Sequence, residues 1–183
     1  MISTTDPVET IFKLFEDRGD QSYGESVTVL DHSLQSAEFA RRAGEPDTIV
    51  VAALLHDAGH LVCNAAEDIA SQGVDTVHEE AGADFLAQWF GPEVVEPGRL
   101  HVAAKRYLCA TDQDYANGLS PASSESLALQ GGPFTREQCT EFEANPYWRE
   151  ALVLRRYDDM GKVPGMVVKP LRSYESLLRS FLL

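Results

Sequence analysis

The chain has 183 residues, of which 44% are hydrophobic and 24% are charged, an ordinary composition for a soluble globular protein. Its 15 lysine and arginine residues stand against 29 aspartate and glutamate residues, and the net charge of -14 would repel a phosphate backbone, which argues against a nucleic-acid partner. No apolar run approaches the roughly 20 residues of a membrane helix, and the first residues are polar and acidic, so we expect no membrane partner. Three scattered cysteines form no C-x-x-C pair, which is typical of reduced thiols, and we therefore expect a cytoplasmic protein.

Apolar residues recur at helical spacing along nearly the whole chain. Asp6-Pro7 is typical of a helix start, and Thr135 with Gln138 has the pattern of a capping box at another. Further helices are predicted over residues 27–43, 48–56, 76–90, 94–108 (with Pro97-Gly98 as a point where it can break), 121–129, 146–157 and 173–181, with loops over 112–121 and 130–133. Since no period-2 strand is evident, we predict an all-α bundle in which residues 1–183 form one domain.

The helix predicted over residues 48–56 is apolar on all sides, which is typical of a central helix. It runs directly into His56-Asp57-Ala58-Gly59-His60. If the helix continues, two imidazoles stand at i and i+4 on one face with a carboxylate between them. Gly59 has no side chain and would let another group approach closely. This segment is therefore the first candidate for a metal site.

The chain has five histidines, and a single histidine beside apolar residues is more often a hydrogen-bonded core residue than a ligand. Several histidines together with carboxylates favour a metal site instead, because imidazole suits Fe, Zn, Ni and Cu while a carboxylate can bridge two ions. With a late aspartate added to this set, the candidate ligands are His32, His56, Asp57, His78, His101 and Asp158. These residue types predict a site for two metal ions but do not choose between iron, zinc and manganese.

The order His32, then His56-Asp57, then Asp158 resembles the HD-domain superfamily, an all-α bundle in which such residues bind one or two metals. Longer segments are similar to the HD-domain mixed-valence di-iron oxygenases, which cleave the carbon–phosphorus bond of 1-hydroxyalkylphosphonates. The matching runs are Leu30 to Gln35, Leu55 to His60, His101-Val102-Ala103-Ala104-Lys105-Arg106-Tyr107-Leu108, Gln130-Gly131-Gly132-Pro133, Arg155-Arg156-Tyr157-Asp158 and Gly161-Lys162. The resemblance therefore covers nearly the whole chain, from about Glu25 to Lys162.

This resemblance implies an enzyme with two iron ions in a mixed-valence Fe(II)/Fe(III) state and with O2 as co-substrate. It implies one iron on His32, His56, Asp57 and Asp158, and a second on His78 and His101, with Asp57 bridging the two. It implies catalytic roles for His60 and Glu25, where Glu25 occupies an iron position until substrate displaces it. The implied substrate contacts are Tyr23, Glu25, His60, Lys105, Gln130, Gly131 and Arg155. Arg offers a bidentate fork and Lys a point charge to such an anion.

Two substrates fit the resemblance: a 1-hydroxy-2-(trimethylammonio)ethylphosphonate giving glycine betaine, and its primary-amine analogue giving glycine. The order Tyr23-Gly24-Glu25 departs by one position from the pattern of the amine-specific enzymes, and this favours the trimethylated substrate slightly. The first alternative is a metal-dependent phosphohydrolase acting on a nucleotide or phosphate monoester. A second is a non-catalytic HD-like binding module, which the intact ligand set disfavours.

Overall fold

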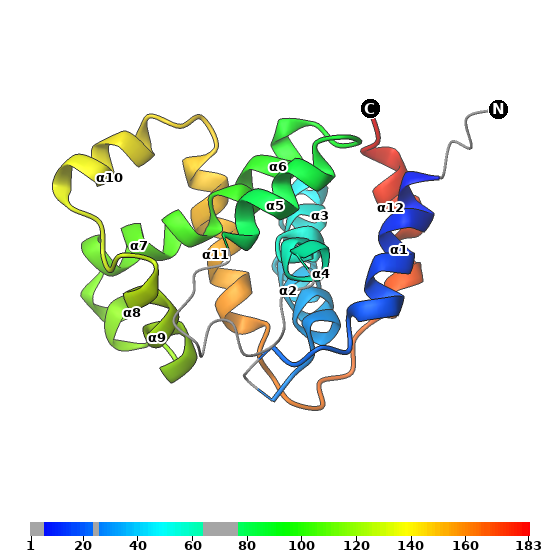
Figure 1. The fold of residues 1–183 in the computed structure, drawn as a ribbon, viewed down its shortest axis with the longest axis horizontal. Coiled ribbons are helices and arrows are strands. Elements are labelled where there is room, and N and C mark those ends of the chain that lie inside the picture. The colour runs from blue at the N-terminus through cyan, green and yellow to red at the C-terminus, as the bar shows by residue number, and fades with distance from the viewer. Residues whose placement is uncertain (1–5, 24–25, 64–76) are drawn as a thin grey trace.

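The computed structural model describes residues 6–23, 26–63 and 77–183. Their helices, in chain order (Figure 1), are α1 Pro7–Arg18, α2 Val29–Ala43, α3 Asp47–Leu55, α4 Ala58–Cys63, α5 His78–Leu86, α6 Pro92–Arg99, α7 His101–Thr111, α8 Gln113–Asn117, α9 Pro121–Leu129, α10 Arg136–Glu143, α11 Trp148–Met160, the 3-10 helix η1 Leu171–Tyr174 and α12 Glu175–Ser180. Within the described ranges, strand-like pairing is limited to isolated bridges at Ser22–Thr28 and Phe90–Leu182. The predicted all-α class is confirmed.

Both predicted helix starts have the expected capping bonds. The Asp6 carboxylate accepts a hydrogen bond from the backbone N–H of Val8 at 2.9 Å, ahead of proline at the first helical position of α1. At α10, the Thr135 hydroxyl accepts from the Gln138 N–H at 3.3 Å, while the Gln138 side chain accepts from the Thr135 N–H at 2.9 Å.

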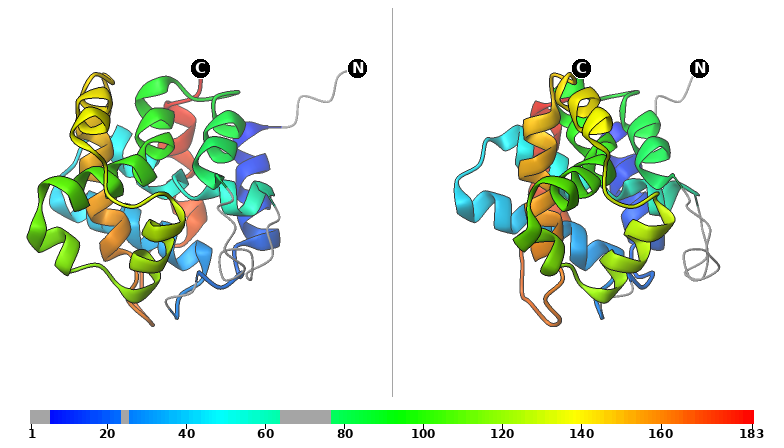
Figure 2. Two further views of the ribbon diagram at one scale, coloured as in Figure 1. Left: turned by 60° about the vertical axis from the view of Figure 1, so that its left-hand side comes forward. Right: turned by 90° about the vertical axis from the view of Figure 1, so that its left-hand side faces the viewer.

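The central helix α3 is buried on all sides, and its apolar residues pack against α2, α6, α11 and α12. Figures 1 and 2 show α11 running through the middle of the molecule beside α2 and α7, with α1 and α12 together on one flank. A second, smaller apolar cluster lies under α10 and comprises Ala104, Phe142 and Ala151 with Leu100, Ala103, Tyr107, Phe134, Trp148 and Leu152 around them. The assignment of residues 1–183 to one domain stays a prediction.

The expectation that His56 and His60 share one continuous helix face is wrong. Helix α3 ends at Leu55, His56 and Asp57 form a turn, and α4 begins at Ala58. The break lets α4 lie against α5, where Gly59 meets Gly82 and the carbonyl of His78. Gly59 therefore does permit a close approach, and the group that approaches is the backbone that carries His78.

Other boundaries also differ from the sequence pattern. The predicted loop 112–121 contains the short helix α8, whose start is capped by the Asp112 carboxylate accepting from the Tyr115 N–H at 3.0 Å. The helix predicted over 94–108 is interrupted at Leu100, whereas Pro97 lies inside α6. Helix α11 continues beyond the predicted end to Met160. None of the helices in the described part of the chain combines the length and apolar character needed to cross a membrane.

Substitution of Gly59 tests the contact between α4 and α5. A β-carbon at this position would lie 1.8 Å from the His78 carbonyl oxygen and 2.9 Å from the Gly82 nitrogen, so backbone must move. We expect Gly59→Ala to cost about 3 kcal/mol of folding free energy, as overpacking does, and to lower Tm by roughly 6–12 °C. The measurement is thermal unfolding by circular dichroism. Gly118→Ala is the control, since its nearest contact would be 3.3 Å; equal losses in both variants would contradict the prediction.

Candidate metal centre

The six candidate ligands come from separate parts of the fold and meet at one buried point. His32 lies on α2, His56 and Asp57 form the turn after α3, and the other three are on α5, α7 and α11. His78 and His101 are the first residues of their helices. All six are buried, with relative exposures from 0% to 8%: His32, His56, Asp57, His78, His101 and Asp158.

Asp57 divides this cluster into two groups. Its Oδ2 lies 3.3 Å from the Nε2 atoms of both His32 and His56. Its Oδ1 lies 3.5 Å from the Nε2 atoms of both His78 and His101. Asp158 joins the first group, with Oδ1 3.4 Å from His32 Nε2. Each Asp57 oxygen thus faces one pair of imidazoles, which is the arrangement of a bridging carboxylate.

The backbone sets the tautomers of three of these histidines. The Nδ1 atoms of His32, His56 and His101 lie 2.8, 2.8 and 2.6 Å from the carbonyl oxygens of Gly161, Ala53 and Gly98. A carbonyl can only accept, so each Nδ1 carries the hydrogen and each neutral ring turns an Nε2 lone pair to the cluster. The two Nε2 atoms of His32 and His56 are only 3.2 Å apart, as are those of His78 and His101. Lone pairs at this distance need a proton or cation between them.

The two carboxylates also need a proton or cation beside them. Both oxygens of Asp57 and Oδ1 of Asp158 are buried and accept no hydrogen bond from the described residues, an expensive arrangement for an anion without a cation. Burial would raise the pKa of Asp57, but neighbouring imidazoles that carry a second proton, His56 first, would hold it well below its usual range. Burial lowers the pKa of His101 to about 3. The donor set, made of four imidazoles and two carboxylates, fits two divalent or trivalent cations.

Aromatic rings surround the outer side of the cluster. Tyr23 stacks on His32 with ring centroids 3.9 Å apart, and His60 stacks on His78 at the same separation. The rings of Tyr23 and His60 meet edge to face at 6.1 Å. The His60 side chain is 31% exposed, unlike the buried ligands. These two predicted contact residues therefore lie against the candidate ligands His32 and His78, while Glu25 lies outside the described residues.

A group of buried cations adjoins the cluster. Lys105 and Arg155 are only 3% and 4% exposed. Arg155 Nη1 donates to Asp158 Oδ2 at 2.6 Å, which links the cations to the ligand set. Lys105 Nζ donates to the Ser126 hydroxyl at 2.7 Å, and Lys162 Nζ donates to the Ser123 hydroxyl at 2.9 Å. Sequence reasoning missed both serines, because hydroxyls on a short polar helix have no recognisable spacing.

The turn containing Gln130 and Gly131 is held by hydrogen bonds from Arg106 and from its own backbone. Arg106 donates to the Gly132 carbonyl at 2.7 Å and to the Gly131 carbonyl at 3.3 Å, and it lies over the Phe134 ring. Gly131 has a positive φ of 94°, which favours glycine at this position. The Gln130 side-chain oxygen is buried and accepts no hydrogen bond from the residues the structure describes.

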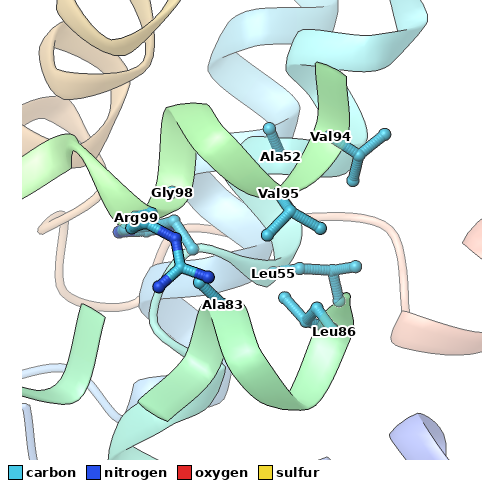
Figure 3. Close-up of a pocket in the computed structure, with 9 residues that line it drawn as sticks. Ala52, Leu55, Ala83, Leu86, Val94, Val95, Gly98 and Arg99 are labelled. Carbon is cyan, nitrogen blue, oxygen red and sulfur yellow. The ribbon is translucent and has the colours of Figure 1, made fainter. Parts of the chain in front are cut away.

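An apolar pocket lies on the other side of His56, between α3, α5 and α6. Figure 3 shows Leu55, Leu86 and Val95 converging there, with Arg99 at its edge. The space is too narrow for a water molecule. It therefore serves as dry packing behind the candidate ligand His56, and the polar and charged side chains lie elsewhere around the cluster.

Comparison with known proteins identifies the family of the chain. The HD domain family model matches residues 29–113. The chain is 44% identical over 176 residues to hydroxymethylphosphonate dioxygenase of Gimesia maris, covering 96% of this chain and 88% of the relative. It is 47% identical over 160 residues to the glycine-betaine-forming [1-hydroxy-2-(trimethylamino)ethyl]phosphonate dioxygenase of Leisingera caerulea, covering 87% of this chain and 82% of that relative.

Removal of the Asp57 charge tests the two-cation arrangement. We expect metal at 100 times its dissociation constant to stabilise the protein by about 2.7 kcal/mol and to raise Tm by roughly 5–10 °C. In Asp57→Asn the metal-induced rise in Tm should be lost, because the two pairs of imidazoles lose the carboxylate that lies between them. Metal content by elemental analysis should fall in parallel. Asp47→Asn, at an exposed position in the first turn of α3, serves as control. Full metal loading of Asp57→Asn would contradict the bridging role.

Proposed function

Because this chain belongs to the HD-domain family of phosphonate dioxygenases, we propose that it uses O2 to cleave the carbon–phosphorus bond of a 1-hydroxyalkylphosphonate. One observation carries the proposal beyond the family relation. The buried Arg155 lies directly beside the His/Asp cluster and donates to the candidate ligand Asp158, and the buried Lys105 follows the candidate ligand His101 by four residues on α7. A site that pairs metals with an anion-binding group suits a substrate that carries both a hydroxyl and a phosphonate.

The proposed metals are two iron ions in a mixed-valence Fe(II)/Fe(III) state. His32, His56, Asp57 and Asp158 would hold the first, and His78 and His101 the second, with Asp57 between them. When bound, the pair would supply O2 activation and a Lewis acid for the substrate's oxygens. The backbone carbonyls that fix the imidazole tautomers would orient the ligands, as outer hydrogen bonds commonly do at metal sites. Affinity alone does not select iron over zinc or manganese.

The proposed phosphonate subsite is assigned to Lys105 and Arg155, together with Gln130 and Gly131. Lys162, Ser123 and Ser126 extend this subsite, because each serine hydroxyl accepts from one lysine. In a protein of net charge -14, buried cations are costly unless an anion compensates them. Arg155 already pairs with Asp158 and Asp159, but Lys105 donates to the neutral Ser126 hydroxyl, so a phosphonate dianion would give Lys105 a charge-assisted hydrogen bond that a neutral polyol could not.

His60 and Tyr23 are proposed to face the hydroxyl-bearing carbon and the far end of the substrate. His60 stacks over His78 and is partly exposed, so it is placed to hold or move a proton at the substrate hydroxyl. The Tyr23 ring offers an aromatic face that suits a quaternary ammonium. Glu25, outside the described residues, is proposed to leave a metal position when substrate arrives. We favour the trimethylammonium substrate and glycine betaine as product over the primary amine and glycine.

The decisive test follows oxygen uptake and phosphate release together. Iron-loaded protein would be offered hydroxymethylphosphonate, the amino- and trimethylammonio-hydroxyethylphosphonates and a panel of phosphate monoesters. We expect O2 consumption and phosphate release in equal amounts from one hydroxyphosphonate. Anaerobic phosphate release from a monoester would instead establish a metal-dependent phosphohydrolase and would end the oxygenase proposal.

The charge of Lys105 should appear in the pH dependence of the reaction. Burial, and then the neighbouring Arg155 cation, lowers the pKa of Lys105 to about 8. The protonated form binds the anion, so kcat/KM should decline as pH rises through this value, since kcat/KM reports the free enzyme. Lys105→Arg stays charged and should lack this decline. Lys105→Met should lose about 2 kcal/mol of substrate interaction, roughly 30-fold in kcat/KM at pH 7. An unchanged decline in Lys105→Arg would show that another group titrates.

A further inference from the structure

We propose that Tyr115 and Asp159 are positioning residues that hold the Arg155 guanidinium in place for the substrate anion. Neither residue was singled out by the sequence, and Tyr115 lies in a segment predicted to be a loop. The inference rests on the proposed phosphonate function, because it assigns what aims the principal cation of that site. Tyr115 acts through Arg155, Asp159 acts through Arg155 and also lies 3.5 Å from Lys162 Nζ, and neither residue is placed in contact with the reacting atoms.

The donors of Arg155 are divided between two sides. Its Nε donates to the Tyr115 hydroxyl at 3.0 Å and to Asp159 Oδ2 at 3.1 Å, and Nη2 donates to Asp159 Oδ1. Its Nη1 donates to Asp158 Oδ2 at 2.6 Å. The Tyr115 hydroxyl in turn donates to Asp159 Oδ2 at 2.6 Å. One edge of the guanidinium is therefore fixed on Asp159 and Tyr115, and Nη1 is directed to the metal cluster.

The competition between two carboxylates explains why this fixation matters. Asp158 and Asp159 lie three and four residues after Arg155 on α11, so both are within reach of its side chain. A guanidinium facing a single carboxylate favours a bidentate pair. Without Asp159, Arg155 would turn both Nη groups onto Asp158, away from the substrate and in competition with the metal. Asp159 therefore acts as a counter-anion that leaves Asp158 with one donor.

Tyr115 adds a fixed point from outside α11. It lies on α8, which buries none of its own residues, so its polar bonds to Arg155 and Asp159 carry much of the link between α8 and α11. Burial raises the pKa of the Tyr115 phenol well above its ordinary value, and the neutral hydroxyl can accept from Arg155 while donating to Asp159. The side chain of Arg155 is thus restrained by two elements.

A purely structural role would connect α8 to α11 without affecting anion affinity, and the two roles have different consequences. The probe is methylphosphonate, which has the anionic group but no hydroxyl to oxidise, used as a competitive inhibitor and in calorimetry with the metal-loaded protein. We expect its inhibition constant to rise about tenfold or more in Asp159→Asn, as for losing a hydrogen bond between charged groups, and about threefold to tenfold in Tyr115→Phe, as for losing an ordinary hydrogen bond. KM for the hydroxyphosphonate should rise in parallel, more than kcat falls, with the metal content unchanged.

The matched control is Tyr107→Phe, which removes a tyrosine hydroxyl that donates to Glu143 at 2.6 Å on the surface between α7 and α10. Its inhibition constant should equal that of the wild type. A double-mutant cycle completes the test: in an Arg155→Lys background, Tyr115→Phe should have little further effect, because neighbours that act through one group are not additive.

The possible failures are distinguishable. If the wild type oxidises hydroxyphosphonates but Tyr115→Phe and Asp159→Asn leave the inhibition constant unchanged, or lower Tm alone, the positioning role is overturned and the proposed function stands. If the two substitutions weaken methylphosphonate binding in a protein that shows no O2-coupled phosphate release, the positioning role stands and the oxygenase function is overturned. Additive effects of Tyr115→Phe and Arg155→Lys would also overturn the positioning role, since Tyr115 would then act independently of Arg155.

Discussion

The arrangement of the molecule depends on a buried carboxylate, Asp57, between two pairs of imidazoles. In the described structure neither of its oxygens accepts a hydrogen bond, and each lies 3.3 to 3.5 Å from two Nε2 atoms. Such an anion is stable in a protein interior only when cations lie beside it. The rest of the fold can be understood as the means by which four histidines and a second aspartate are brought from five segments to this one residue.

Close backbone contacts make that convergence possible. The carbonyl of Gly161, just after α11, fixes the ring of His32 on α2, and a β-carbon there would overlap the Ser36 hydroxyl. Gly59 similarly lets α4 touch the backbone of His78. The position of each ligand is therefore set by where helices end and touch, with the buried α3 as the element around which they pack.

Much of the fold and the set of candidate ligands could be predicted from the sequence, because helical spacing, capping residues and the His-Asp pair are local signals. The turn at His56 and Asp57 could not, since helix propensity gives no sign of a break that tertiary packing of α4 on α5 produces. Helix α8 was missed because it is short and buries no residue. The roles of the Ser123 and Ser126 hydroxyls depend on lysine partners that are distant in sequence. The role of the Asp159 carboxylate depends on the buried side chain of Arg155, which it shares with other partners. The periodicity of apolar residues cannot predict such pairings.

The electrostatics of the chain place a final constraint on how an anion can be recognised. A net charge of -14 disfavours long-range attraction of a phosphonate, and at physiological ionic strength surface charges act over only about 8 Å. Recognition must therefore come from short-range cations in a medium where charge interactions are strong. Lys105 and Arg155 satisfy this condition because both are almost fully buried. The same burial makes their position critical, since the N–H groups that a guanidinium commits to neighbouring carboxylates are not available to a substrate. A network that divides Arg155 between Asp158 and Asp159 keeps a buried charge available without leaving it uncompensated.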